Sequence, residues 1–212
     1  MMRVAAVVMF VLLLCSSPAH AHPHVWVDIK VRVLFDAEGR VTALHETWLF
    51  DDYYSAFALS GADKDGDGKP DQKLLDEVLA ENLKNLAEYN YFTRIMSGET
   101  VVATGTARDA ASRVQDKRLE MSFLLPLDAP VSAADLPLRY AVYDPTYYIE
   151  MVHAEAPDAV TLADAPTGCA FELKQPDPDP EQVVLAASLD KTQTAGNGLG
   201  GYFAEEVFLT CG

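Results

Sequence analysis

Two histidines near the start of the chain, His22 and His24, are separated by a single proline. In an extended segment, residues two apart point to the same side of the backbone, so both imidazoles can reach one ion. Imidazole nitrogen is a common ligand of divalent transition metals, among which we consider Zn²⁺, Ni²⁺, Co²⁺ and Cu²⁺. The pattern predicts a transition-metal site at this end of the chain. The alternative is a frayed terminus without a function.

Cleavage after Ala21 would add a donor to this site, because the α-amine of His22 would then lie beside its own imidazole. That arrangement is the geometry of a copper histidine brace. A square-planar site built on a third-position histidine is excluded, because it needs backbone amide nitrogens and Pro23 has no N–H. Metal capture and a copper brace remain as alternatives.

Four other side chains are candidates to complete the metal site. Asp51 and Asp52 follow a predicted strand, and the hairpin register described below brings them near His24. His45 and His153 each lie within a predicted strand, where a hydrogen-bonded histidine is commoner than a metal ligand. We therefore rank the two aspartates above these two histidines.

A second set of ligands suits calcium. Acidic residues occupy the first, third, fifth and ninth positions of a calcium-binding loop: Asp63, Asp65, Asp67 and Asp71. Gly68 stands at the sixth position, where the loop turns sharply. An EF-hand places a bidentate glutamate at the twelfth position, where this chain has Leu74, so Asp76 or Glu77 would have to substitute. The alternative is an acidic turn that binds no calcium.

The start of the chain has the organisation of a secretory signal peptide. Arg3 precedes an apolar stretch at 4–14, and the triplet Ala19-His20-Ala21 has the small residues that signal peptidase accepts. The apolar stretch is shorter than the roughly 20 residues that a membrane span needs. We predict a signal peptide at 1–21, cleaved after Ala21, and one periplasmic domain at 22–212 that is not embedded in the membrane.

Two cysteines remain after this cleavage, Cys169 and Cys211. An even pair in an oxidising compartment predicts a disulfide, which stabilises the fold by about 3–4 kcal/mol in the chain-entropy model. The alternative is a thiolate pair that binds a soft metal, and the export signal argues against it.

The composition is strongly acidic, with 32 Asp and Glu against 16 Lys and Arg and a formal net charge of -16 at pH 7. This excess repels phosphate backbones and anionic lipids and attracts cations. We therefore expect binding neither to nucleic acid nor to a membrane surface. The sequence has no Gly-x-Ser-x-Gly motif and no phosphate-binding loop, so we predict no enzymatic activity.

The elements that would position these side chains begin with a hairpin. Alternating apolar residues predict a strand at 25–33, with His24 on its polar face. The following residues fit a three-residue hairpin loop with a left-handed glycine, and a second strand follows at 40–50. Continuing this register inward sets Lys30 opposite Glu46, unless a bulge changes the partners.

Helical and extended patterns alternate in the rest of the chain. Helices are predicted at 53–59, at 71–88 and from the proline-rich turn at 176–180 to residue 189. Strands are predicted at 100–107, 118–127, 138–143, 147–154 and 160–163, and in a last strand that ends at Cys211. The sum is an α+β fold, a mostly antiparallel β-sheet with inserted helices in a single domain.

Several of these segments resemble a bacterial periplasmic family, the domain of unknown function 1007. The residues that carry the resemblance are His22-Pro-His-Val-Trp-Val-Asp28, Trp48-Leu-Phe-Asp51, the acidic loop at 63–71, Tyr143-Asp-Pro-Thr-Tyr-Tyr-Ile149 and Gly-Leu-Gly-Gly-Tyr-Phe-Ala before Cys211. The resemblance implies a periplasmic component of an uncharacterised ABC-type transport system, in a genomic setting similar to that of companions of nickel/cobalt permeases and zinc uptake systems. It assigns the family's His-Pro-His to His22 and His24, and its acidic loop to the four aspartates.

Together these features predict a metal-binding accessory protein of the periplasm, associated with transport of Zn²⁺, Ni²⁺ or Co²⁺. Its expected partner is an inner-membrane metal permease or the components of an ABC transporter. The alternatives are a copper histidine-brace protein and a non-catalytic binding module stabilised by calcium.

Overall fold

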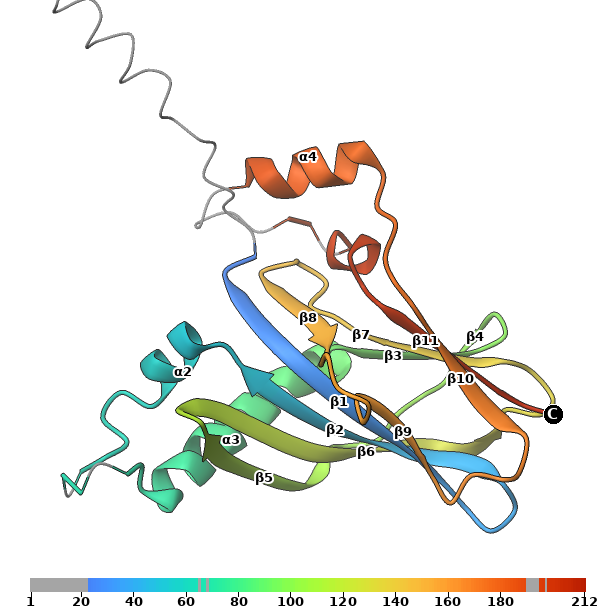
Figure 1. The fold of residues 1–212 in the computed structure, drawn as a ribbon, viewed down its shortest axis with the longest axis horizontal. Coiled ribbons are helices and arrows are strands. Elements are labelled where there is room, and N and C mark those ends of the chain that lie inside the picture. The colour runs from blue at the N-terminus through green and yellow to red at the C-terminus, as the bar shows by residue number, and fades with distance from the viewer. Residues whose placement is uncertain (1–22, 65, 68, 190–194, 197) are drawn as a thin grey trace, which may run out of the picture.

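The fold is organised around a long antiparallel hairpin of β1 (Val25–Phe35) and β2 (Arg40–Phe50). The computed structural model describes residues 23–64, 66–67, 69–189, 195–196 and 198–212 (Figure 1). Alternate residues of β1 are buried, from Val25 to Phe35, as the sequence pattern predicts. In the turn, Gly39 has φ of +76°, and a Cβ there would lie 2.6 Å from the ring of Pro166.

The predicted register of this hairpin is wrong by one residue along most of its length. Asp36 and Arg40 still close the turn, with the Asp36 amide donating to the Arg40 carbonyl at 2.9 Å. A bulge between Leu34 and Phe35 then shifts the partners, so Lys30 lies opposite Thr47 instead of Glu46. Because of this shift, Glu46 faces the core.

The hairpin forms the middle of the first sheet, called sheet A below. Its strand order is β5-β6-β2-β1-β8, and β9 also pairs with β1. β8 and β9 run parallel to β1 and pair with successive parts of its edge, whereas the other pairs are antiparallel. The added strands are β5 (Arg108–Gln115), β6 (Arg118–Ser132), β8 (Ile149–His153) and β9 (Val160–Ala163).

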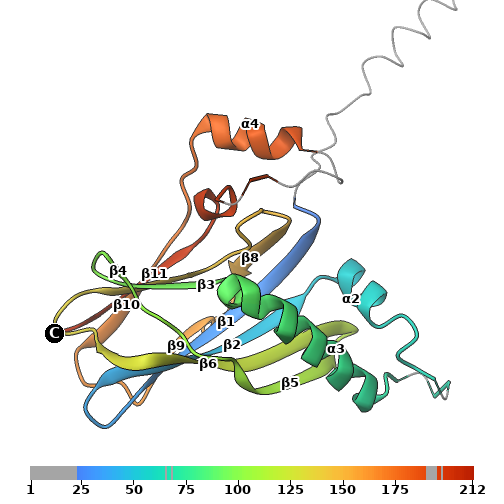
Figure 2. The same cartoon turned by 180° about the vertical axis from the view of Figure 1, so that it is seen from behind.

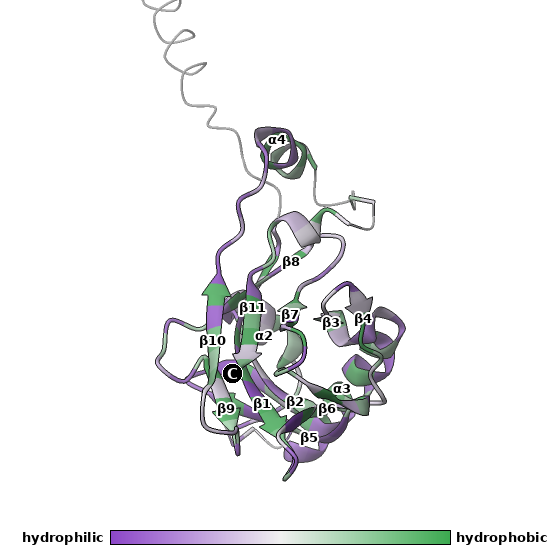
Figure 3. Ribbon diagram, turned by 90° about the vertical axis from the view of Figure 1, so that its right-hand side faces the viewer, coloured by the Kyte–Doolittle hydropathy of each residue, from purple (hydrophilic) through white to green (hydrophobic). Residues whose placement is uncertain are grey.

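A second sheet, called sheet B below, is antiparallel and has the order β10-β11-β7-β3-β4. Its strands are β3 (Thr93–Ser97), β4 (Thr100–Val101), β7 (Leu138–Val142), β10 (Cys169–Lys174) and β11 (Glu206–Cys211). In β11, the buried residues Val207 and Leu209 alternate with partly or fully exposed ones, as expected for a strand with one buried face. β10, at the edge of the sheet, has no fully buried residue. Figure 3 shows hydrophobic and hydrophilic residues along both strands.

The core lies between the two sheets and continues under a helix. Trp48 and Phe123 of sheet A and Ile95, Tyr140 and Leu209 of sheet B are almost fully buried there. α3 lies on the side of sheet A that faces sheet B, near β5 and β6, and contributes Leu75 and Leu79 to the core (Figure 2). The helices are α2 (Asp52–Ala58), α3 (Gln72–Leu86) and α4 (Pro180–Ser188), with two short 3₁₀ helices, η1 (Ala87–Phe92) and η2 (Gly200–Tyr202).

This architecture confirms the predicted α+β class with mostly antiparallel strands. The three predicted helices correspond to α2, α3 and α4. The strand predicted at 100–107 is wrong in extent, because only β4 forms there, and the predictions lack β3, β5 and β10. In the part of the chain that the structure describes, no helix is long and apolar enough to cross a membrane.

Candidate functional site

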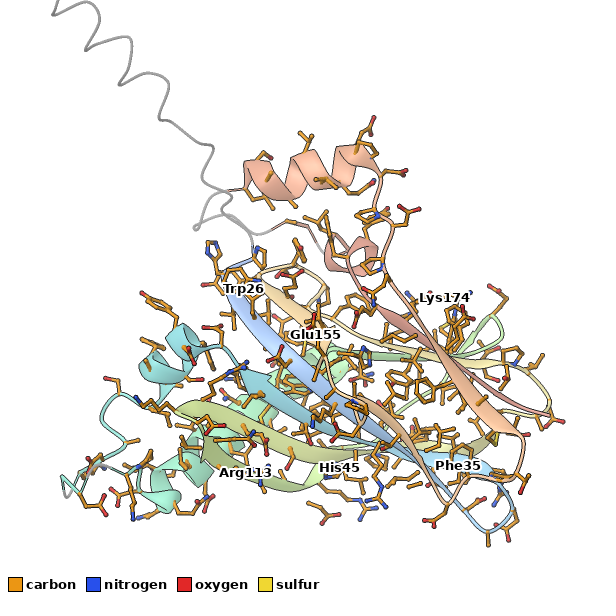
Figure 4. All side chains as sticks on the ribbon, viewed as in Figure 1. Trp26, Phe35, His45, Arg113, Glu155 and Lys174 are labelled. Atoms are coloured by element: carbon orange, nitrogen blue, oxygen red, sulfur yellow. A yellow bond between two sulfur atoms is a disulfide. The ribbon has the colours of Figure 1, made fainter. Side chains whose placement is uncertain are left out.

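His24 lies just before β1 and is held by the residue that precedes β8. Its backbone N–H donates to the carbonyl oxygen of Tyr148 at 2.9 Å, and the centroids of the two rings are 4.9 Å apart. The alternation of β1 places His24 on the outer side of sheet A together with Trp26, whose side chain is exposed (Figure 4). This agrees with the predicted polar face.

Asp51 follows the end of β2 and lies beside the start of β1, where the predicted hairpin places it. Its carboxylate accepts hydrogen bonds from backbone amides there. Oδ2 accepts a hydrogen bond from the amide of Trp26 at 2.9 Å. Oδ1 accepts from the amides of Tyr53 and Tyr54 at 2.8 and 2.9 Å, so Asp51 also caps α2. Asp52 is the first residue of α2 and is exposed.

The loop that positions Tyr148 is fixed by Asp144, which is buried. Oδ1 of Asp144 accepts from the amide of Thr146 at 2.8 Å, and Oδ2 accepts from the amides of Tyr148 and Ile149 at 3.1 Å each. The sequence predictions do not include Asp144. The signal that could have found it is the Asp-Pro-Thr sequence, because aspartate favours turns through bonds to nearby backbone amides.

A glycine-rich segment packs against the same loop. The amides of Gly198 and Gly200 donate to the carbonyl of Pro145 at 3.0 and 3.1 Å, and a Cβ at Gly200 would overlap the carbonyl of Asp144. The ring of Tyr147 stacks on that of Phe203 with centroids 4.1 Å apart. Three segments that are distant in sequence, 23–28, 143–149 and 198–203, therefore form one unit around the residues that hold His24.

His153 lies on the opposite side of sheet A, in the core, so the structure does not bring it to His24. Its Nδ1 lies 2.7 Å from Oε2 of Glu205, and its Nε2 lies 3.4 Å from the hydroxyl of Tyr140. Burial raises the pKa of Glu205, but hydrogen bonds from His153 and Gln175 outweigh it and hold that pKa below its usual value. Both ring nitrogens of His153 thus have partners within the protein.

Glu46 is a second buried acid between the sheets, and it is fully inaccessible to solvent. Its Oε2 accepts a hydrogen bond from the indole of Trp48 at 3.0 Å, and its Oε1 lies 2.8 Å from the hydroxyl of Thr93. Burial raises the pKa of Glu46 to about 7. Burial and the charges of Glu46 and Glu205 raise the pKa of Tyr140 well above its usual value. The predicted hairpin register pairs Glu46 with Lys30, so it does not reveal this buried position.

His45 is on the outer side of sheet A but far from His24. It lies opposite Arg32, eight positions further along β1, which corresponds to about 26 Å at roughly 3.3 Å per residue. Figure 4 shows His45 well separated from Trp26 on the sheet. His45 lines a cavity of about 580 Å³ together with Lys30 and Arg113.

The acidic loop before α3 folds back onto its own backbone. Asp63 Oδ1 accepts from the amide of Gly66 at 2.7 Å, and Asp67 Oδ1 accepts from the amide of Lys69 at 2.8 Å. Asp71 Oδ2 accepts from the amide of Lys64 at 3.3 Å. Asp65 lies outside the described residues, and Glu77 forms an exposed ion pair with Lys73 at 3.9 Å. Calcium binding stays a prediction.

The metal site as a whole also stays a prediction. Among the residues that the structure describes, no three His, Cys, Asp or Glu side chains gather as a metal-binding group. His22, the first predicted ligand, lies outside those residues. Its donor type and that of His24 fit Zn²⁺, Ni²⁺, Co²⁺ and Cu²⁺ alike.

The predicted disulfide is confirmed. Cys169 and Cys211 are bonded at 2.02 Å and lie opposite each other in the register of β10 and β11. The bond therefore closes the chain between residues 169 and 211 and links the edge strand of sheet B to its neighbour.

Comparison with known proteins finds similarity along nearly the whole chain. A protein from Haemophilus influenzae, described as an uncharacterized protein, is 26% identical over 194 residues, which are 90% of this chain and 91% of that protein. An uncharacterized 15.5 kDa protein in the trpE 3′ region of Spirochaeta aurantia is 30% identical over 107 residues, which are 50% of this chain and 76% of that protein. A family model described as "Protein of unknown function (DUF1007)" matches residues 7–211, and the chain therefore belongs to the DUF1007 family.

Proposed function

We propose that this protein is a metal-binding accessory protein of the periplasm, which binds Zn²⁺, Ni²⁺ or Co²⁺ through His22 and His24 and passes the ion to an inner-membrane permease or ABC transporter. The observation that supports the proposal is the fixed position of His24. Its backbone N–H donates a hydrogen bond to the carbonyl of Tyr148, and the amide of Tyr148 donates in turn to the buried carboxylate of Asp144. A ligand held by surrounding residues loses little conformational entropy when it binds an ion.

A carboxylate that the sequence predictions do not include lies on the same side of sheet A. Glu150 of β8 is opposite Trp26 in the register of β1 and β8, and Trp26 and His24 share the outer side. Carboxylate and imidazole together are a common donor set for Zn²⁺. We therefore add Glu150 to the candidate ligands, alongside Asp51 and Asp52.

The first experiment is to determine the mass of the exported protein and to titrate it calorimetrically with Zn²⁺, Ni²⁺, Co²⁺ and Cu²⁺. The proposal predicts a chain that starts at His22, with an affinity for at least one of the first three ions that falls tenfold or more in His22→Ala/His24→Ala. His45→Ala is the matched control, because it removes an imidazole from the same side of the same sheet, eight positions away along β1. Its affinity should equal that of the unchanged protein.

Two further results separate the alternatives. Glu150→Gln should weaken the same ion while retaining both imidazoles. Tight binding of Cu²⁺ alone would favour the histidine brace instead. Unchanged affinity in the double histidine variant would overturn the proposal and leave a binding module without a transition metal.

A further inference from the structure

Two arginines lie side by side on the outer face of sheet B, Arg94 of β3 and Arg139 of β7. The register pairs Arg94 with Ala141 and Met96 with Arg139, so the two arginines are diagonal neighbours about 7–8 Å apart, with their Cβ atoms somewhat closer. The residues that alternate with them, such as Ile95 and Tyr140, are buried between the sheets. Both guanidinium groups therefore project away from the core.

Among the residues that the structure describes, these two arginines have no acidic partner within ion-pair distance, although acidic residues outnumber basic ones two to one in the sequence. Within the described ranges, neither guanidinium forms an ion pair or a hydrogen bond, and Nε of Arg139 is shielded from solvent. By contrast, Arg40, Arg113 and Arg118 each contact a carboxylate at 2.6–2.7 Å. Adjacent like charges and an unsatisfied buried donor both reduce stability.

The two arginines line a cavity of about 330 Å³, which we call the sheet B cavity. Its other walls include the aromatic residues Tyr143 and Tyr202, with Glu206 as an acidic group. Tyr143 is packed against the glycine-rich segment, since a Cβ at Gly201 would lie 3.6 Å from its ring. The cavity thus combines two guanidinium groups with aromatic side chains, and its volume is at the lower end of the range for small-molecule sites.

We propose that the sheet B cavity binds a small organic monocarboxylate. A planar guanidinium donates two parallel hydrogen bonds to a carboxylate, and the second guanidinium supplies the remaining charge. The aromatic rings would contact the apolar part of the ligand. Glu206 disfavours a second negative charge on the ligand, which argues for one carboxylate over a phosphate or a dicarboxylate. This proposal does not depend on metal binding at His24.

Calorimetric titration with benzoate, succinate and inorganic phosphate at constant ionic strength tests the proposal. We expect saturable binding of benzoate, weakened tenfold or more in Arg94→Gln and Arg139→Gln. Arg32→Gln is the matched control, because Arg32 is an exposed arginine on the other sheet and its loss changes the net charge equally. Glu206→Gln should tighten binding of all three anions and reduce the preference for benzoate over succinate.

The outcomes are separable even where a variant is unstable. Circular dichroism shows whether each variant is folded. Arg139→Lys retains the charge but removes the planar guanidinium, so it should weaken benzoate binding more than Arg32→Gln does. Equal weakening in Arg32→Gln and Arg139→Gln would mean a general charge effect and would overturn the site. Preferential binding of phosphate would overturn the ligand class, and no saturable binding of any of the three anions would overturn the proposal as a whole.

Discussion

Glu46 of β2 and Thr93 of β3 join the two sheets inside the core, with Oε1 and Oγ1 2.8 Å apart. The same hydroxyl lies 2.9 Å from the carbonyl oxygen of Tyr91. A hydroxyl has one hydrogen to donate, so it cannot bond both oxygens at once. A protonated Glu46 resolves this conflict, because its own O–H donates to Thr93 while Thr93 donates to Tyr91. The geometry and the raised pKa therefore agree on a neutral Glu46 below about pH 7.

This relationship predicts an unusual pH dependence of stability. Because the pKa of Glu46 rises from 4.5 to about 7 on folding, the folded state binds the proton more tightly than the unfolded state. The resulting stabilisation is complete below pH 4.5 and is lost as the pH rises through 7, by roughly 3 kcal/mol. Urea unfolding between pH 4.5 and pH 8 measures this loss.

Glu46→Gln is the variant that isolates the effect. The amide is neutral at every pH, its oxygen can accept from Trp48, and its N–H can donate to Thr93. We expect its free energy of unfolding to vary less between pH 4.5 and pH 8 than that of the unchanged protein. Parallel curves for the two proteins would show that Glu46 does not titrate in this range.

Glu205 should show the opposite sign. Its folded pKa lies below the usual value, so the stabilisation it provides is present above pH 4.5 and is lost as the pH falls through the folded pKa. Glu205→Gln removes the carboxylate that contacts Nδ1 and the amide of buried His153, and the loss of these buried hydrogen bonds should destabilise the fold by about 1–3 kcal/mol at pH 7. Glu206→Gln, at the adjacent partly exposed position, should change stability far less in the same urea titration.

The sequence pattern predicts the hairpin well but not its register. Unbroken alternation in β1 leaves one apolar face, and burial of that face decides which residues point inward. The bulge between Leu34 and Phe35 depends on how β2 meets β6 as well as β1, and no local pattern marks it. β5 is missed for a related reason: it is an edge strand with largely exposed residues, whose extended form depends on pairing with β6.

For the candidate site too, the sequence predicts which face of the sheet a residue lies on but not which distant residue it contacts. The outer position of His24 and the inner position of His153 follow from local alternation, since Ile149 and Met151 share the face of His153. The partner of His153 does not follow, because Glu205 is 52 residues away in the sequence. Contacts over such separations are set by the pairing of β8 with β1 and of β11 with β7, which periodicity within one strand does not encode.

Gly200→Ala tests whether the glycine-rich segment is needed to hold the loop of Asp144. A Cβ at Gly200 would overlap the backbone carbonyl of Asp144, which cannot move without disturbing the loop. We expect a loss of about 1–3 kcal/mol, typical of overpacking, measured as a lower melting temperature. Gly196→Ala is the control, because a Cβ there meets no atom of the described residues within 4 Å. Equal melting temperatures for the two variants would show that the segment adapts without cost.

The disulfide between Cys169 and Cys211 makes a further prediction about stability. It joins residues 42 apart, and in the chain-entropy model closing a loop of that length stabilises the folded state by about 4 kcal/mol. Urea unfolding with and without dithiothreitol should show a loss of this order for the unchanged protein. The double variant Cys169→Ser/Cys211→Ser should unfold at the lower urea concentration in both conditions, because it has no bond to reduce. A variant that is destabilised further by dithiothreitol, or an unchanged protein that is insensitive to full reduction, would contradict this account of the bond.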